Sequence, residues 1–237
     1  VPNTVTKTLH TDKVYEPDLN SFTIEPFPYY SPLKSQIETI KSFDRPVILV
    51  DDLVHKADRL QVLVPQLRED GIPIRKVVVG VLSGYGRDLM QCLKVPVESI
   101  YSMPNLRQWF VESTLYPFIG GDTVRREEMK VAGLQPSINM ILPYATPRLS
   151  GCSREALVEF SACCIENSKN LFQVLEAEYR KMYAKNLTLS RLSEAVILPL
   201  CPDKGSCMEY DENLAASVYL ENDLETLWRM KEFLIKG

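Results

Sequence analysis

The sequence predicts an α/β protein with a doubly wound parallel sheet and a helical C-terminal extension. Strand-like apolar runs alternate with helix-like segments in the first half, which requires parallel strands joined by right-handed crossovers. In the last third, apolar residues recur at helical spacing instead. The strand-like runs lie at 47–50, 76–82 and 97–102. We expect an α/β domain over residues 1–146, with an N-terminal arm over 1–31, and a helical extension over 147–237.

The composition excludes two classes of partner. A formal net charge of -4 provides no basic field for a nucleic-acid backbone. No apolar run approaches the roughly 20 residues of a membrane helix. Six cysteines in a chain that is 45% hydrophobic indicate reduced thiols, not a disulfide framework. We therefore expect a cytoplasmic protein, and Val1 in place of a start methionine indicates a piece of a longer, multidomain polypeptide.

The N-terminal arm is rich in threonine, proline and aromatic residues, which favour extended structure. We expect strand pieces around residues 4–6 and 21–24. A helix is expected from Ser31, as its N-cap, with Pro32 at the first helical position. Leu33, Ile37 and Ile40 then share one face of this helix.

Two adjacent carboxylates follow the first buried strand. Four apolar β-formers after Pro46 predict a strand at 47–50 that is covered on both faces. Asp51 and Asp52 then fall at the carboxyl end, where open α/β sheets bind ligands. Two like charges in a crevice repel each other and lose hydration, a cost that hydroxyl donors or a cation offset. A ribose diol with Mg²⁺ would supply both.

The remaining elements follow from periodicity and from breaker residues. Leu60 to Leu67 form an amphipathic helix stopped by Asp70–Gly71, and Pro65 kinks it or delays its start. Another helix is expected over 84–94. After a linker bracketed by Pro143 and Pro147, Ser153 caps a long helix that runs to about Lys185. Shorter helices are expected at 190–198, 211–220 and 223–236.

Receiver domains of response regulators also place acidic residues after a first strand. They need a phospho-acceptor aspartate at the end of a later strand. Here the later strands end in Ser83–Gly84 and Met103–Pro104, so the acceptor is absent. This assignment is disfavoured.

The segment 36–107 resembles the type I phosphoribosyltransferases, nearest the orotate phosphoribosyltransferase branch. Their hallmark is an apolar strand, two acidic residues and a turn that opens a helix, and 47–60 is similar to it. Residues 84–89 and 95–106 are similar to the glycine turn and final strand of that branch. Three residues of the arm are faintly similar to its basic mobile loop: Lys7, His10 and Lys13.

The resemblance implies binding of Mg²⁺-bound phosphoribosyl pyrophosphate. Asp51 and Asp52 would hold the ribose hydroxyls or the metal. The phosphate turn would be formed by Lys56, Ala57, Asp58 and Arg59, after His55. In the family, backbone N–H groups at the helix N-terminus surround the 5-phosphate.

The turn departs from the family pattern. Ala57 replaces a glycine, and a Cβ at positive φ costs on the order of 1 kcal/mol. Asp58 adds a negative charge beside the expected phosphate, whereas Lys56 and Arg59 could hold it by charge. His55 is a candidate general acid or base, the alternative being a surface histidine at a helix start.

Three functions remain open from the sequence. The first is a domain with a degenerate site that binds a ribose-phosphate or nucleotide ligand. The second is an active, Mg²⁺-dependent transferase. The third is a non-catalytic assembly or interaction module that uses the long helix from Ser153. A homodimer, or an upstream domain of the same chain, is the expected macromolecular partner.

Overall fold

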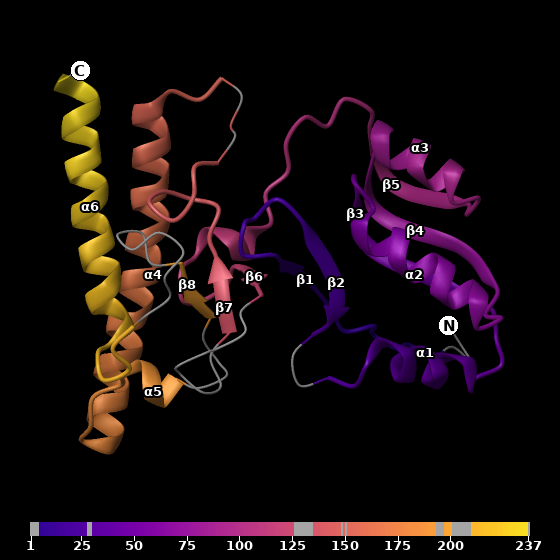
Figure 1. Cartoon of the computed structure of the whole chain (residues 1–237), viewed down its shortest axis with the longest axis horizontal. Coiled ribbons are helices and arrows are strands. Elements are labelled where there is room, and N and C mark those ends of the chain that lie inside the picture. The colour runs from indigo at the N-terminus through magenta and orange to yellow at the C-terminus, as the bar shows by residue number, and fades with distance from the viewer. Residues whose placement is uncertain are drawn as a thin grey trace. The chain divides into compact units, whose positions relative to one another are not determined.

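The chain forms two compact units. The computed structural model describes residues 5–27, 30–125, 135–147, 149, 151–192, 197–200 and 210–236 (Figure 1). The first unit combines Val1–Lys13 with Thr23–Trp109, and the second combines Val14–Phe22 with Phe110–Gly237. The predicted boundary after residue 146 lies inside the second unit.

The first unit contains a parallel sheet of strand order β3-β4-β5. Helices connect successive strands, so the predicted strand–helix–strand–helix–strand order is confirmed and the fold is α/β. Helix α1 precedes β3. The elements are α1 (Leu33–Lys41), β3 (Val47–Val54), α2 (Asp58–Glu69), β4 (Ile74–Ser83), α3 (Gly84–Cys92) and β5 (Val97–Met103).

Helices α2 and α3 pack on one face of this sheet. Strand order equals chain order, and α2 and α3 share one buried cluster, so both helices cover the same face, whereas the predicted doubly wound sheet would carry helices on both faces. Leu60, Val64 and Met90 of the helices cluster with Val77 and Val79 of β4. Together these side chains form the core of the helix-covered face.

The opposite face of the sheet carries exposed apolar side chains. Val50 of β3 is 78% exposed and Ile100 of β5 is 75% exposed. The prediction of a strand covered on both faces is therefore wrong. An all-apolar strand sequence does not reveal that its two faces have different neighbours, because alternation is hidden when both faces are apolar.

Helix α1 packs against α2. Ile37 and Ile40 cluster with Leu63 and Leu67, as the apolar face of the predicted helix requires. The prediction for the helix start is wrong in detail: Pro32 is the N-cap residue, and no side chain caps the helix. Helix α2 runs through Pro65.

The second sheet has mixed strand directions and the order β2-β1-β6-β7-β8. Strand β6 pairs parallel with β1 and antiparallel with β7, and β7 pairs parallel with β8. A short 3-10 helix, η1 (Glu112–Leu115), precedes β6. The strands are β1 (Thr11–Tyr15), β2 (Phe22–Pro26), β6 (Asp122–Val124), β7 (Gln135–Ile138) and β8 (Ile197–Pro199).

Two long helices, α4 (Arg154–Tyr183) and α6 (Ala216–Lys236), pack along each other. Ser153 caps α4 as predicted, since its Oγ accepts from Ala156 N at 3.1 Å. In the chain, α5 (Leu189–Leu192) follows α4 and precedes β8 and α6. None of the helices in the described ranges is long and apolar enough to cross a membrane.

The predicted short helices of the C-terminal part need correction. The segment expected to be helical to residue 198 ends its helix at Leu192, and strand β8 follows at Ile197–Pro199. The two helices expected at 211–220 and 223–236 are one helix, α6, which begins at Ala216 and contains Asn222. A single helix buries Leu220, Leu224 and Leu227 along one side, and this packing favours continuity over a break at Asn222.

We expect Gly86→Ala to destabilise the first unit by about 3 kcal/mol, because an added Cβ would lie 2.2 Å from the Val54 carbonyl oxygen. Urea unfolding would measure this. The control is Gly71→Ala, whose Cβ would meet no atom within 4 Å but whose φ is +75°, so about 1 kcal/mol is expected there. Equal losses would contradict the close approach of α3 to β3.

Candidate functional site

The acidic pair lies within β3, not beyond its end. Asp51 aligns with Val79 of β4, and the strand continues to Val54. The prediction that this strand ends at Val50 is therefore wrong. Asp51 Oδ1 accepts from Asp52 N at 3.0 Å, and Asp52 Oδ1 accepts from Leu53 N at 2.7 Å. Each carboxylate therefore binds the next backbone amide, and Asp52 is exposed.

Burial raises the pKa of Asp51 above its ordinary value of 3.8, and a side-chain hydrogen bond with Asp52 raises that pKa further. The positive charge of Arg59 acts in the opposite direction. A proton or a cation between the two carboxylates relieves their repulsion.

The two carboxylates of Asp51 and Asp52 can supply part of the coordination of a Mg²⁺ ion. Across the described residues, no group of three or more histidine, cysteine or acidic side chains could hold a metal. Mg²⁺ is commonly bound by one or two carboxylates, with water and substrate phosphates completing the octahedron. Asp51 and Asp52 could hold Mg²⁺ in this manner, together with a ligand.

A tight turn connects β3 to α2. Ala57 is the N-cap residue of α2 and has a φ of 54°, in the left-handed region. No side chain caps this helix. The first-turn N–H groups of α2 therefore lack the side-chain acceptor that usually satisfies such donors, and the helix dipole adds positive potential at this end.

The basic residues of the turn are exposed. The side chains of Lys56 and Arg59 flank the start of α2, and both residues are open to solvent. Gln61 Nε2 donates to the Lys56 carbonyl oxygen at 2.9 Å, which fixes the backbone and leaves the lysine side chain out of this contact. Two cations therefore stand beside the positive end of the helix.

Lys13 of the N-terminal arm reaches the turn. Its Nζ lies 3.0 Å from Asp58 Oδ2, and about a quarter of each side chain is exposed. The pair offsets the negative charge that Asp58 would place beside a phosphate. The other arm residues lie elsewhere: the ring of His10 stacks on Tyr30 with centroids 3.7 Å apart, and Lys7 is exposed.

His55 contacts a residue that sequence analysis did not identify. Its Nδ1 lies 2.8 Å from Ser83 Oγ, at the end of β4. Ser83 is 1% exposed, caps α3 and accepts from Gly86 N at 2.9 Å. A buried hydroxyl held in this way is a cap, not an accessible nucleophile. The rings of Tyr85 and His55 form an edge-type contact, with centroids 6.0 Å apart and an angle of 61° between the planes.

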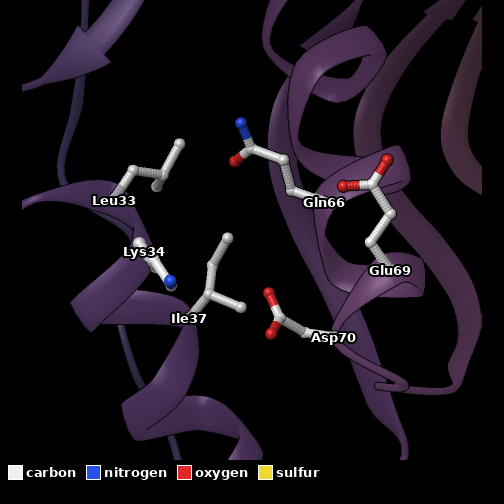
Figure 2. A pocket seen from close by; sticks show the side chains of 6 residues that line it. All are labelled: Leu33, Lys34, Ile37, Gln66, Glu69 and Asp70. Atoms are coloured by element: carbon white, nitrogen blue, oxygen red, sulfur yellow. The ribbon is translucent and has the colours of Figure 1, made fainter.

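A pocket of about 370 Å³ lies between α1 and α2. Figure 2 shows residues of the two helices facing each other across it. It is formed at the C-terminal end of α2, whereas the turn lies at the N-terminal end. Its lining contains none of the predicted site residues: Leu33, Lys34, Ile37, Gln66, Glu69 and Asp70.

No protein-family model, curated protein or solved structure matches this chain.

We expect the ion pair between Lys13 and Asp58 to contribute about 1 kcal/mol of coupling in a double-mutant cycle, since both side chains are largely buried. Urea unfolding of Lys13→Ala, Asp58→Ala and the double variant measures it. The pair Lys76–Glu98 is the control, because Glu98 is 63% exposed and its coupling should be smaller. Coupling at Lys13–Asp58 that is zero, or unchanged in molar salt, would contradict this.

Asp51→Asn should raise the free energy of unfolding at neutral pH. The raised pKa means that the folded state binds a proton more tightly than the unfolded state, so stability falls as pH rises from 3.8 through the folded pKa. Asparagine does not ionise, so the gain should vanish near pH 3, where both proteins are uncharged at this position. Urea midpoints at several pH values test this, and a loss of stability at pH 7 would refute it.

Proposed function

We propose that the first unit is a phosphoribosyltransferase-like domain that binds a ribose-phosphate or nucleotide ligand at the β3–α2 turn. One observation carries the proposal: an acidic pair on β3 is followed, after a short turn, by an uncapped helix N-terminus that two exposed cations flank, Lys56 before the N-cap and Arg59 in the first turn. The carboxylate acceptors of β3 and the amide and cationic donors at the start of α2 therefore lie on one short segment of the chain.

The donor half of the site suits a phosphate. The first-turn amides of α2 have no capping side chain, and Lys56 and Arg59 lie beside them. Helix N-termini bind anions because their N–H groups and the dipole both favour negative charge. The guanidinium of Arg59 could add a bidentate contact.

The acceptor half suits a diol or a metal-bound pyrophosphate. Asp51 and Asp52 present carboxylate oxygens that can accept from two hydroxyl groups. When bound, Mg²⁺ would neutralise charge on a pyrophosphate leaving group. The chain's own residues would position the ribose and shield the developing charge, which is how phosphoribosyl transfer to a nitrogen nucleophile is accelerated.

The turn combines a left-handed residue with charged side chains. Ala57 adopts the left-handed conformation that a glycine would adopt more easily. Lys13 compensates the charge of Asp58. These two features support ligand binding by charge, with weaker contact to backbone amides than a glycine turn gives. We therefore favour binding over efficient transfer.

A non-catalytic assembly role is the second candidate. Exposed apolar side chains support it: Val50 and Ile100 on the sheet, and Val174 and Met182 on α4, at 61% and 70% exposed. Surfaces of this kind often contact other proteins. The two candidates differ in one measurable property, which is affinity for a phosphorylated sugar.

Isothermal titration calorimetry with phosphoribosyl pyrophosphate and Mg²⁺ tests the proposal. We expect binding by the 237-residue chain, a loss of about tenfold or more in affinity for Arg59→Ala, and a comparable loss for Asp51→Asn. The matched control is Arg75→Ala, an exposed arginine near the start of β4. Absence of heat at millimolar ligand, or equal losses for Arg59→Ala and Arg75→Ala, would refute the proposed site.

A further inference from the structure

We infer that Ser83 is a positioning residue that fixes the proton of neutral His55 on Nε2, so that His55 presents a hydrogen-bond donor to an anionic ligand. The inference deepens the proposed function and, for the ligand, rests on it. The assignment of the His55 proton to Nε2 rests only on the hydrogen bonds of Ser83.

The hydrogen bonds of Ser83 determine which way its proton points. The hydroxyl accepts from Gly86 N at 2.9 Å as the cap of α3. Its single proton must then go to an acceptor, and at 1% exposure water cannot take this role. His55 Nδ1, at 2.8 Å, is the acceptor that the contacts of the described residues provide.

The hydrogen bond from Ser83 determines the tautomer of the His55 ring. A neutral ring has one N–H, so an Nδ1 that accepts from Ser83 leaves the proton on Nε2. The partly exposed ring therefore offers an N–H group to a ligand. Because Lys56, Arg59 and the α2 amides are also donors, His55 extends a donor surface that matches phosphate or pyrophosphate oxygens.

The backbone holds the two residues together. Val54, which precedes His55, aligns with Leu82, which precedes Ser83, in the parallel ladder of β3 and β4. Helix α3 approaches β3 so closely that a Cβ on Gly86 would lie 2.2 Å from the Val54 carbonyl oxygen. Only glycine allows this approach, which brings the cap of α3 within hydrogen-bond distance of His55.

Nitrogen-15 NMR of histidine-labelled full chain tests the inference. The chain contains two histidines, so His10 serves as an internal reference. In neutral wild-type protein, we expect His55 with a protonated Nε2 and a hydrogen-bonded, unprotonated Nδ1. In Ser83→Ala, the Nδ1 resonance should shift to the position of a free imidazole, while His10 does not change.

The control for lost helix capping is Ser153→Ala, since Ser153 caps α4 in the same way without a histidine partner. It should leave the His55 spectrum unchanged. If Ser83→Ala does not fold, Ser83→Thr, which keeps the hydroxyl, should reproduce the wild-type spectrum. A proton on Nδ1 in the wild type, or a His55 spectrum indifferent to Ser83→Ala, overturns the inference.

Ligand affinity separates this inference from the proposed function. With phosphoribosyl pyrophosphate and Mg²⁺, Ser83→Ala should weaken binding about threefold to tenfold, as the loss of one oriented hydrogen bond predicts. Ser153→Ala should bind like the wild type. If the wild type binds no ligand while the Nε2–H form is observed, the proposed function fails and the positioning of His55 stands.

Discussion

The parallel pairing of β3 with β4 is the constraint on which the candidate site depends. It aligns Val54 with Leu82 and so brings His55, which follows β3, beside Ser83, the last residue of β4. His55 and Ser83 meet for this reason, although they are 28 positions apart in sequence. The same pairing holds the start of α2 at the edge of the sheet from which the acidic pair is reached. A shift in this register would separate His55 from Ser83, whereas Asp51, Asp52, Lys56 and Arg59 would stay together on one segment of the chain.

The sequence predicted the core of the first unit well because periodicity and breakers agree there. The order of β3, α2, β4, α3 and β5 follows from apolar runs separated by helical spacing, and those signals are local. The cap at Ser153 was equally predictable, since a serine before an apolar helical pattern is a local signal too. Such features need no knowledge of tertiary contacts.

The errors arose where tertiary contacts decide the structure. Strand β3 was predicted too short because two carboxylates interrupt an apolar pattern that Leu53 and Val54 resume. Strand β1 was missed because its residues are largely polar, and its pairing with β6 is through the backbone. The contacts of Ser83 with His55 and of Lys13 with Asp58 join distant segments, so no local pattern indicates them.

The ion pair between Lys13 and Asp58 links the N-terminal arm to the turn thermodynamically. An anion that draws Lys13 away from Asp58 binds more weakly by the free energy of that ion pair. Conversely, docking of the arm changes the affinity of the turn for the anion by the same free energy. The coupling is reciprocal, so a change that loosens the arm also alters the occupancy of the turn. Lys13 of β1 thus acts as an adjustable counter-charge for the β3–α2 turn.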